Sequence, residues 1–511
     1  MNQRKAGAFL SYIAIFIHIV VGLIYTPYML RVMGKSEYGI FSLASSVISY
    51  LTILDLGFGN AVIRYTAKLK AENKMFEQQK LFGMFIKLYI VIGAVAFICG
   101  AILSLNAEAL FSEKMTAVEV ERTKIMLWLM TFNLAITFPM SIWGAIMSAY
   151  ERFIFQRVIS IIRSVLNPLV MVILLFYGYR AVAMVVVTTL FNIATLLINF
   201  LYCKRILHIK VVYGKINWSL LKDVSMYSFW IFLTVIMDKV YWSSGQFILG
   251  VYQGAKPIAV YSVALTLLHM YMLFSTSISG VFLPRITEMV VKGNNRKAIS
   301  DVFVRTGRIQ YISMIYILSG FILFGQSFIH LWAGSGYENS YTICLLLFIP
   351  LTVPLIQNLA ITILQARNQM KFRSLLYIAI AIICLILCIP LGKKYGEIGC
   401  AIATSFSLLL GQVVLINIYY QKKQGLNIYQ FWTEIGKMSI VPILVMTSFK
   451  FIISILDLNT NHPLVLAISI IAFSVIYFPL FWRFSMNEYE RDLFRKPLQR
   501  LNLLKSKSTA L

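Results

Sequence analysis

The sequence predicts an all-α protein that crosses a lipid membrane many times, because of its composition and its apolar runs. Of its 511 residues, 59% are hydrophobic and only 13% are charged, and the mean hydropathy is +0.79. A soluble chain of this length would carry far more charge. Many apolar runs exceed the roughly 18 residues that mark a membrane-spanning helix. Backbone groups inside hydrocarbon must pair within their own segment, so these runs are expected to be helices.

Hydropathy and length predict about fourteen membrane helices along the chain. The expected spans are 8–31, 38–60, 82–104, 124–147, 153–176, 181–203, 224–250, 257–283, 303–324, 340–364, 372–391, 398–420, 435–456 and 463–482. The first apolar run is too long for a signal peptide and has no typical cleavage site. It is therefore expected to be the first helix.

Basic residues predict the orientation of these helices. Most of the 46 Lys and Arg residues fall in alternate connections, including 64–80, and in the tail 485–511. Because Lys and Arg accumulate on the cytoplasmic side, both termini and the 64–80 loop are expected there, and the 106–121 loop outside. The same spread along the chain accounts for the net charge of +26, so a nucleic-acid partner is not expected.

The sequence contains an internal repeat. A shift of 221 residues aligns Arg64 with Arg285 and the segments around them, and a shift of 218 aligns Tyr177 with Tyr395. Duplication explains the matches in polar loops better than chance similarity between apolar helices does. A repeat of six helices keeps both copies in the same orientation, an arrangement that suits a transporter whose halves rock about a central site.

The predicted organisation is two parallel six-helix repeats followed by two C-terminal helices. The expected segments are an N-lobe at 1–203, a cytoplasmic linker at 204–223, a C-lobe at 224–420, helices thirteen and fourteen at 421–484 and a basic cytoplasmic tail at 485–511.

Three segments resemble the polysaccharide branch of the multidrug/oligosaccharidyl-lipid/polysaccharide exporter superfamily. They are YTPYMLRVMGKSEYGIFSLASSV from Tyr25, LDLGFGNAVIRY from Leu54, which is similar to that branch's D-x-G…R segment, and YGEIGCAIAT from Tyr395. The resemblance implies a Wzx-like flippase with a MATE-like fold in the bacterial inner membrane. It implies a substrate of undecaprenyl-pyrophosphate-linked oligosaccharide, such as an O-antigen or capsule unit. Glycosyltransferases and a polymerase of the same pathway are the implied partners.

Arg163 is the basic residue that lies deepest in the expected helices. It lies about ten residues into the fifth helix, roughly 15 Å from the helix end, where snorkelling to water is difficult. Ionisable residues at such depth usually face a cavity or a partner. Two interpretations stay open for Arg163: a cavity-facing cation that binds the substrate, or one half of a structural salt bridge.

Three further basic residues inside or near the helices are candidate substrate ligands. Lys87 lies about six residues into its helix, so snorkelling explains it as well as binding does. Lys239 lies deep in helix seven beside Asp238, but adjacent helical residues diverge by about 100°, so the two are not expected to pair. Arg308 shares a helix face with Arg305 and is expected at the inner mouth of the transporter.

The stretch ILDLGFGNAVIRY places a carboxylate, two glycines and an arginine at the inner end of the second helix. Asp55, Gly57 and Gly59 are candidate gating residues, because the glycines let helices approach closely and the carboxylate can hold a cation in a closed state. Arg64 and its repeat mate Arg285 are either ordinary positive-inside residues or a symmetric pair that meets an anionic head group. Gate and structural roles for this stretch both stay open.

A pyrophosphate-linked substrate requires cations in the transport path. Pyrophosphate cannot enter an apolar cavity unpaired, and Arg adds bidentate hydrogen bonds to its charge. The sequence has no phosphate-cradling Gly loop, no H-E-x-x-H motif and no large soluble domain, so ATP hydrolysis, other enzyme activity, a cofactor and a metal are not expected. The alternatives are a lipid II-type or multidrug exporter of the same superfamily and, in another class, a membrane glycan polymerase. Short outer loops leave a polymerase little room for its site.

Overall fold

The computed structural model describes residues 3–55, 58–214, 218–291, 296–367, 369–493 and 495. Within these ranges, the side chains of residues 3–9, 12, 71, 218–232, 234–235, 277–285, 287–288 and 290–291 lie outside the description.

The described residues form helices and connecting turns, with no strand among them. The helices are α1 Gln3–Leu51, α2 Phe58–Ala71, α3 Met75–Leu105, α4 Ala107–Phe111, α5 Ala117–Ala149, α6 Phe153–Phe176, α7 Ala181–Arg205, α8 Trp218–Tyr252, α9 Ala255–Val291, α10 Arg296–Ala333, α11 Asn339–Ile356, α12 Asn358–Ala366, α13 Lys371–Leu408, α14 Ile416–Tyr419, α15 Ile428–Ile455 and α16 Pro463–Phe484. A 3-10 turn, Thr52–Asp55, follows α1, and π-helical segments at Leu409–Leu415 and Tyr420–Gln424 flank α14.

The all-α membrane class that the sequence predicts is confirmed. Among the described residues, 11 segments are long and apolar enough to cross a membrane. Two of these are double-length and are broken by a glycine with non-helical backbone, Gly34 in α1 and Gly396 in α13. Because each break lies between two of the expected spans, the helices are consistent with the predicted fourteen.

Two pairs of glycines support the internal repeat. Gly34 (φ 76°) and Gly254 (φ 89°) lie 220 residues apart, and Gly178 (φ 85°) and Gly396 (φ 60°) lie 218 residues apart. Side chains with a Cβ rarely adopt these left-handed conformations, so glycine is required at each of the four turns. The repeat of similar turns at a nearly constant spacing is what a duplicated six-helix unit would leave.

The second expected helix and the expected 64–80 loop need correction. The helix predicted at 38–60 stops at Leu51, and the chain becomes helical again from Phe58 to Ala71 as α2. Residues 64–71 are therefore helical, and only a short turn separates α2 from α3 at Met75. The prediction failed because α2 is amphipathic: it buries Phe58, Ala61 and Val62 but carries lysines on its other side, so its mean hydropathy is low.

The chain divides into two compact units. Unit 1 comprises residues 1–266 and 370–411, and unit 2 comprises residues 267–369 and 412–511. The division does not follow the lobe boundaries at 203 and 224, which stay a prediction.

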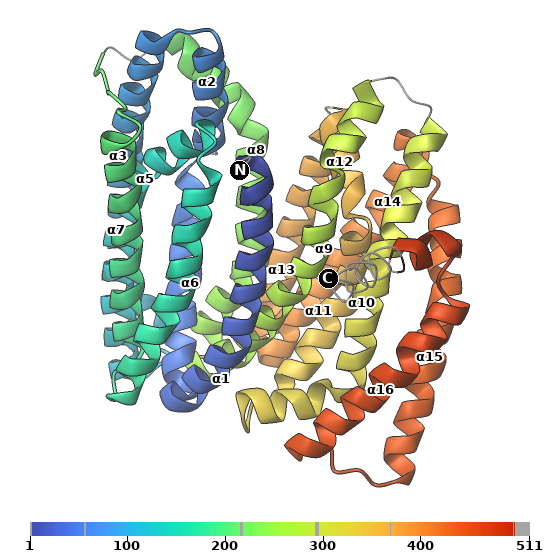
Figure 1. The fold of residues 1–511 in the computed structure, drawn as a ribbon. Helices are drawn as coiled ribbons and strands as arrows, with labels where there is room; N and C mark the ends of the chain where they lie inside the picture. The colour runs from blue at the N-terminus through green and yellow to red at the C-terminus, as the bar shows by residue number, and fades with distance from the viewer. Residues whose placement is uncertain are drawn as a thin grey trace, which may run out of the picture. The chain divides into compact units, whose positions relative to one another are not determined.

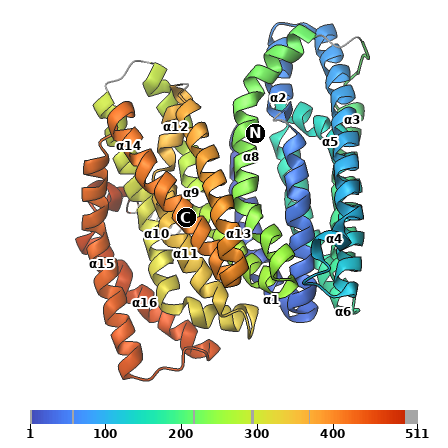
Figure 2. The ribbon, with the colours of Figure 1, turned by 180° about the vertical axis from the view of Figure 1, so that it is seen from behind.

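Unit 1 is a helical bundle built around α5. In Figure 1, α3, α5, α6 and α7 stand side by side, and α5 packs against α1, α3 and α7 while α6 packs against α1. Figure 2 shows the opposite side of the same unit, where α8 packs against α1 and α13. The large side chains Phe82, Phe85 and Tyr89 of α3 are fully buried in this bundle.

Unit 2 is organised around α10. This helix packs against α11, α12, α15 and α16, and α15 also packs against α16. Stacked aromatic rings fill the contacts: Phe303 lies on Phe431 with centroids 5.0 Å apart, and Tyr271 lies on Phe348 at 4.6 Å. In both figures α15 and α16 appear in orange and red, joined by a turn.

Candidate functional site

Arg163 lies in a network of neutral polar side chains within unit 1. Its Nη1 donates a hydrogen bond to Asn192 Oδ1 at 3.2 Å, from α6 to α7. The Asn192 amide nitrogen in turn donates to Asn133 Oδ1 at 2.8 Å and to Thr137 Oγ1 at 2.7 Å, both on α5. Thr137 Oγ1 donates to the Asn133 carbonyl at 2.7 Å. The network joins three helices at one level of the bundle.

The hydrogen bonds orient Asn192 so that its oxygen faces the guanidinium. Both Asn192 amide protons are used toward α5, which leaves Oδ1 as the acceptor for Arg163. A guanidinium carries five N–H donors, and the printed contacts of Arg163 use one of them. The side chain is half-buried, and no described carboxylate forms an ion pair with it. The salt bridge that was one of its two interpretations is therefore not found among the described residues.

Asn167 extends the polar face of α6 by one turn beyond Arg163. Its Oδ1 is buried and accepts no hydrogen bond from any described residue. Residues four apart lie on the same side of a helix, so this acceptor lies near the Arg163 side chain. Sequence reasoning missed Asn133, Thr137, Asn167 and Asn192. Their only signal was a polar side chain within an apolar helix.

Asp55 lies in the break between α1 and α2. It ends the 3-10 turn, and Tyr89 Oη of α3 donates a hydrogen bond to its Oδ1 at 3.0 Å. A Cβ added at Gly59 would lie 3.9 Å from the same Tyr89 oxygen, so α2 and α3 are close at this point. Gly57 lies outside the described residues. The structure thus brings Asp55 and Gly59 together around Tyr89, a buried residue that the sequence did not single out.

The two cations of the predicted inner-mouth pair are described unequally. Arg64 lies on α2 with an exposed side chain. Arg285 lies in α9, but its side chain falls outside the description. The pairing of these residues with a head group stays a prediction.

Lys87 contacts the linker between α7 and α8. Its Nζ donates to the Gly214 carbonyl at 3.0 Å and lies 6.0 Å from the centre of the Tyr213 ring. The linker is also held by a hydrogen bond from the Val212 amide to the Gln79 carbonyl at 3.1 Å. These contacts fit a tether that fastens the linker to α3, and the predicted contact of Lys87 with substrate is not tested by them.

Lys239 and Asp238 lie half-buried on α8. Asp238 interacts electrostatically with Arg373 at the start of α13 as well as with Lys239. A cation from the neighbouring helix therefore faces Asp238, as expected if adjacent residues on α8 point in different directions.

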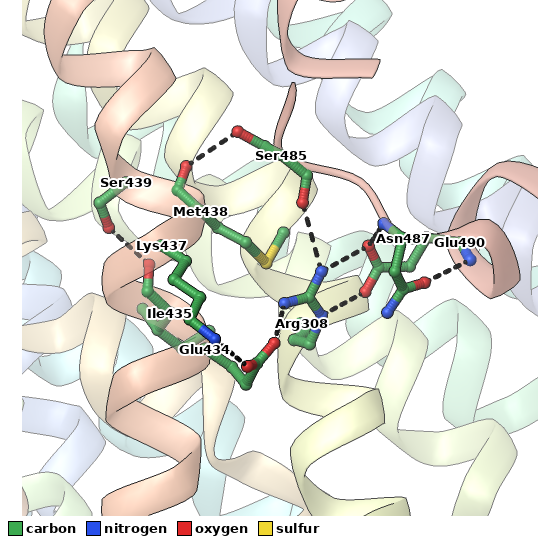
Figure 3. A network of polar contacts seen from close by, with 9 residues as sticks. All are labelled: Arg308, Glu434, Ile435, Lys437, Met438, Ser439, Ser485, Asn487 and Glu490. Atoms are coloured by element: carbon green, nitrogen blue, oxygen red, sulfur yellow. Dashed lines mark hydrogen bonds and ion pairs between the residues drawn. The ribbon is translucent and has the colours of Figure 1, made fainter. Parts of the chain in front are cut away.

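Arg308 occupies a different environment, in unit 2 (Figure 3). Its Nε and Nη2 donate to the two oxygens of Glu490 at 2.6 and 2.9 Å, and its Nη1 donates to Glu434 at 2.6 Å. Nη2 also donates to the Ser485 carbonyl at 3.2 Å. The side chain of Arg308 is 7% exposed and that of Glu490 is fully buried. The guanidinium thus fastens α10 to α15 and to the segment that follows α16.

The remaining contacts of this network strengthen the same attachment. Lys437 pairs with Glu434 at 3.1 Å on α15, and the guanidinium of Arg305 lies 4.4 Å from the centre of the Tyr489 ring. Arg305 and Arg308 therefore share a helix face, as the sequence predicts. That face is covered by residues 485–490, and a contact of Arg308 with substrate stays a prediction.

Comparison with known proteins shows both family and fold. Residues 5–290 match a family model described as polysaccharide biosynthesis protein. A Shigella flexneri protein, provisionally assigned as an O-antigen transporter, is 23% identical over 408 residues, which are 77% of this chain and 92% of that protein.

Two solved structures share the fold. The lipid II flippase MurJ, in an inward closed conformation, is similar with a TM-score of 0.72 at 19% identity, covering 93% of this chain and 99% of MurJ. The MATE multidrug transporter DinF-BH is similar with a TM-score of 0.62 at 16% identity, covering 83% of this chain and 96% of that protein. The chain therefore has the architecture of these transporters and belongs to the polysaccharide biosynthesis protein family.

Proposed function

We propose that this protein flips a lipid-linked oligosaccharide across the bacterial inner membrane by alternating access. The family match and the O-antigen transporter assigned in Shigella flexneri support a surface polysaccharide unit as the cargo. The fold shared with MurJ supports transport of a lipid whose head group crosses while its tail stays in the bilayer. The cargo would be an O-antigen, capsule or related unit on undecaprenyl pyrophosphate.

The observation that carries this proposal is the environment of Arg163. A half-buried cation among neutral amides keeps its full charge and most of its hydrogen-bond donors. Leaving such a charge unpaired in an apolar bundle is costly, so the site is built for an anion that arrives and leaves. A pyrophosphate fits, because the guanidinium fork forms bidentate hydrogen bonds with phosphate oxygens.

The charge of the same network argues against a drug-cation exporter. The described partners of Arg163 are amide and hydroxyl groups, so the network carries a net positive charge. A site for a cationic drug requires the opposite sign. The amides can also accept and donate hydrogen bonds to sugar hydroxyl groups beside the pyrophosphate.

We further propose that the protein is a transporter without enzyme activity, with both termini in the cytoplasm. The proposal predicts flipping in purified proteoliposomes without ATP, and a strict ATP requirement would overturn it. Cysteines placed at Asn73 and at Glu113 test the orientation with an impermeant thiol reagent in intact cells. The proposal expects labelling at Glu113 and none at Asn73.

Depletion in cells tests the transported substrate. If the proposal is correct, depletion causes an undecaprenyl-pyrophosphate-linked oligosaccharide to accumulate on the inner leaflet, where an impermeant lectin cannot reach it. Accumulation of the same glycan on the outer leaflet would instead indicate a block in polymerisation, and would support the glycan polymerase alternative. A normal distribution of lipid-linked glycans would contradict both.

A further inference from the structure

A break between α11 and α12 in unit 2 is surrounded by buried amide side chains. The helices end and begin at Ile356 and Asn358, with Gln357 between them. Gln310 of α10 lies on one side of this break, and Asn417 of α14 contacts Gln357 on another. None of these amides belongs to the Arg163 network or to the Arg308 network.

Hydrogen bonds fix the orientation of the Gln310 amide. Its nitrogen donates to the carbonyl and to the hydroxyl of Ser275 on α9, both at 3.3 Å, and the Ser275 hydroxyl donates to the Leu355 carbonyl at 2.6 Å. Because a carbonyl only accepts, the nitrogen of Gln310 must face Ser275. Its oxygen therefore points away from Ser275. Gln310 is 0% exposed, and that oxygen receives no hydrogen bond from any described residue.

The Gln357 amide is fixed in the same way. Asn417 Nδ2 donates to the Val413 carbonyl at 2.7 Å, so Asn417 Oδ1 is the acceptor for Gln357 Nε2 at 2.8 Å. This leaves Gln357 Oε1 as a second oxygen without a donor among the described residues, on a side chain that is 2% exposed. Two buried acceptors thus flank one helix break, and each unpaired buried group of this kind costs about 1–3 kcal/mol.

The backbone around the break is also rich in available oxygens. Pro350 and Pro354 of α11 have no N–H, so the carbonyls one turn before each lose their helical donors. A Cβ added at Gly307 of α10 would lie 2.9 Å from the Ile356 carbonyl, so α10 closes tightly over the break. The neighbouring chain is π-helical at Leu409–Leu415, an irregularity often found at binding sites.

The chemistry of these groups selects a small monovalent cation. The fully buried amides leave no room for a sugar, and neutral amide and carbonyl oxygens are hard ligands suited to alkali cations. A divalent ion would need carboxylates to balance its charge, and the part of the chain that the structure describes has no group of three or more His, Cys, Asp or Glu residues placed to bind a metal. Unwound helices in transporters present such oxygens to sodium.

We propose that Gln310 and Gln357 bind a sodium ion at the break between α11 and α12. The oxygens Gln310 Oε1 and Gln357 Oε1 supply the side-chain ligands, and carbonyls of the broken helix supply the others. Binding at this site does not require the lipid-linked cargo, so it can be tested even if the proposed function fails.

Purified full-length protein provides the test, by thermal unfolding in NaCl, KCl and choline chloride at constant ionic strength. Sodium should raise the Tm by at least about 2 °C in a saturable manner, and potassium and choline should not. Gln357→Leu should lose this rise. Gln246→Leu, a matched change in unit 1 that removes a hydrogen bond to Ser262, should keep it.

A charged variant keeps the test decisive if Gln357→Leu does not fold. Gln357→Glu preserves the shape and adds a negative charge, so its sodium affinity should rise by about tenfold or more and should fall again at acidic pH. Equal Tm values of the native protein in all three salts would mean that these oxygens hold only water. A sodium-dependent rise that survives in Gln357→Leu, or an unchanged affinity in Gln357→Glu, would likewise overturn the proposal.

Discussion

Arg163 and Arg308 are both arginines in membrane helices, but their surroundings differ in charge. Arg163 in unit 1 is half-buried, and the acceptor that it contacts is the neutral amide of Asn192. Arg308 in unit 2 is 7% exposed and is held by Glu490 and Glu434, as Figure 3 shows. A carboxylate pair neutralises an arginine and makes it part of the scaffold, whereas an amide positions the arginine and leaves its charge available. The charge of the partner, rather than depth alone, therefore separates a fastening arginine from one that can bind a ligand.

The largest expected effect is on stability, from Arg308→Ala. Removing one partner of a buried ion pair leaves the other charge uncompensated, which typically costs about 3–5 kcal/mol. Glu490 is fully buried, so the variant should unfold at lower temperature and be depleted from the membrane. Arg305→Ala, one turn earlier on the same face, should cost about 1 kcal/mol, because it removes only a cation–π contact.

A second substitution checks the cause of the Arg308 effect. Arg308→Met combined with Glu490→Gln removes both charges, so it should be more stable than Arg308→Ala. An abundant, stable Arg308→Ala protein would show that this network does not hold the fold together.

Arg163→Ala is expected to act on transport instead of stability. Losing charge-assisted hydrogen bonds worth about 3 kcal/mol corresponds to a loss of transport of about 100-fold. Protein abundance should stay normal, because no described carboxylate is left unpaired. Arg163→Lys should keep part of the activity, since the charge remains while the bidentate fork is lost. Arg157→Ala, an exposed residue on the same helix, serves as the control and should transport normally.

Asn192→Asp converts the first kind of arginine into the second. The change is nearly isosteric and places a carboxylate 3.2 Å from the Arg163 guanidinium, where Asn192 Oδ1 lies now. The new ion pair should reduce transport by about tenfold, equivalent to about 1.4 kcal/mol, while the protein stays folded. Asn192→Ala should impair transport less. Full activity of Asn192→Asp would mean that the charge of Arg163 is not used.

Lys87→Met is expected to have the smallest effect. Lys87 also contacts a neutral acceptor, the Gly214 carbonyl, but it is exposed, and water can solvate it. Transport should stay within about twofold of the native rate, because exposed charge contacts contribute about 0–1 kcal/mol. Loss of transport comparable to that of Arg163→Ala would instead support the sequence-based assignment of Lys87 to the substrate.

Much of the fold could be predicted from the sequence, because membrane helices follow from hydropathy alone. The span predicted at 153–176 coincides with α6, Phe153–Phe176. The Tyr177–Tyr395 alignment located a pair of left-handed turns at Gly178 and Gly396. The prediction failed at α2, since a helix that is half exposed and basic does not register as a hydrophobic run.

The candidate site could be predicted only in part. Arg163 was found from its depth, which depends on helix position alone. Its partners Asn192, Asn133 and Thr137 come from two other helices, and one sequence does not say which helices meet. The carboxylates around Arg308 were missed for the same reason, because Glu434 and Glu490 lie 126 and 182 residues away in the chain. Long-range partners, which decide the role of each arginine, are set by packing.

The most direct test of the available charge at Arg163 is a comparison of lipid affinities. Purified native protein and Arg163→Ala would be titrated with undecaprenyl pyrophosphate and with uncharged undecaprenol, which share the same tail. The native protein should bind the pyrophosphate about 100-fold more tightly than the alcohol, and Arg163→Ala should lose most of this preference while binding the alcohol normally. An Arg163→Ala protein that keeps the native preference for pyrophosphate would contradict the account.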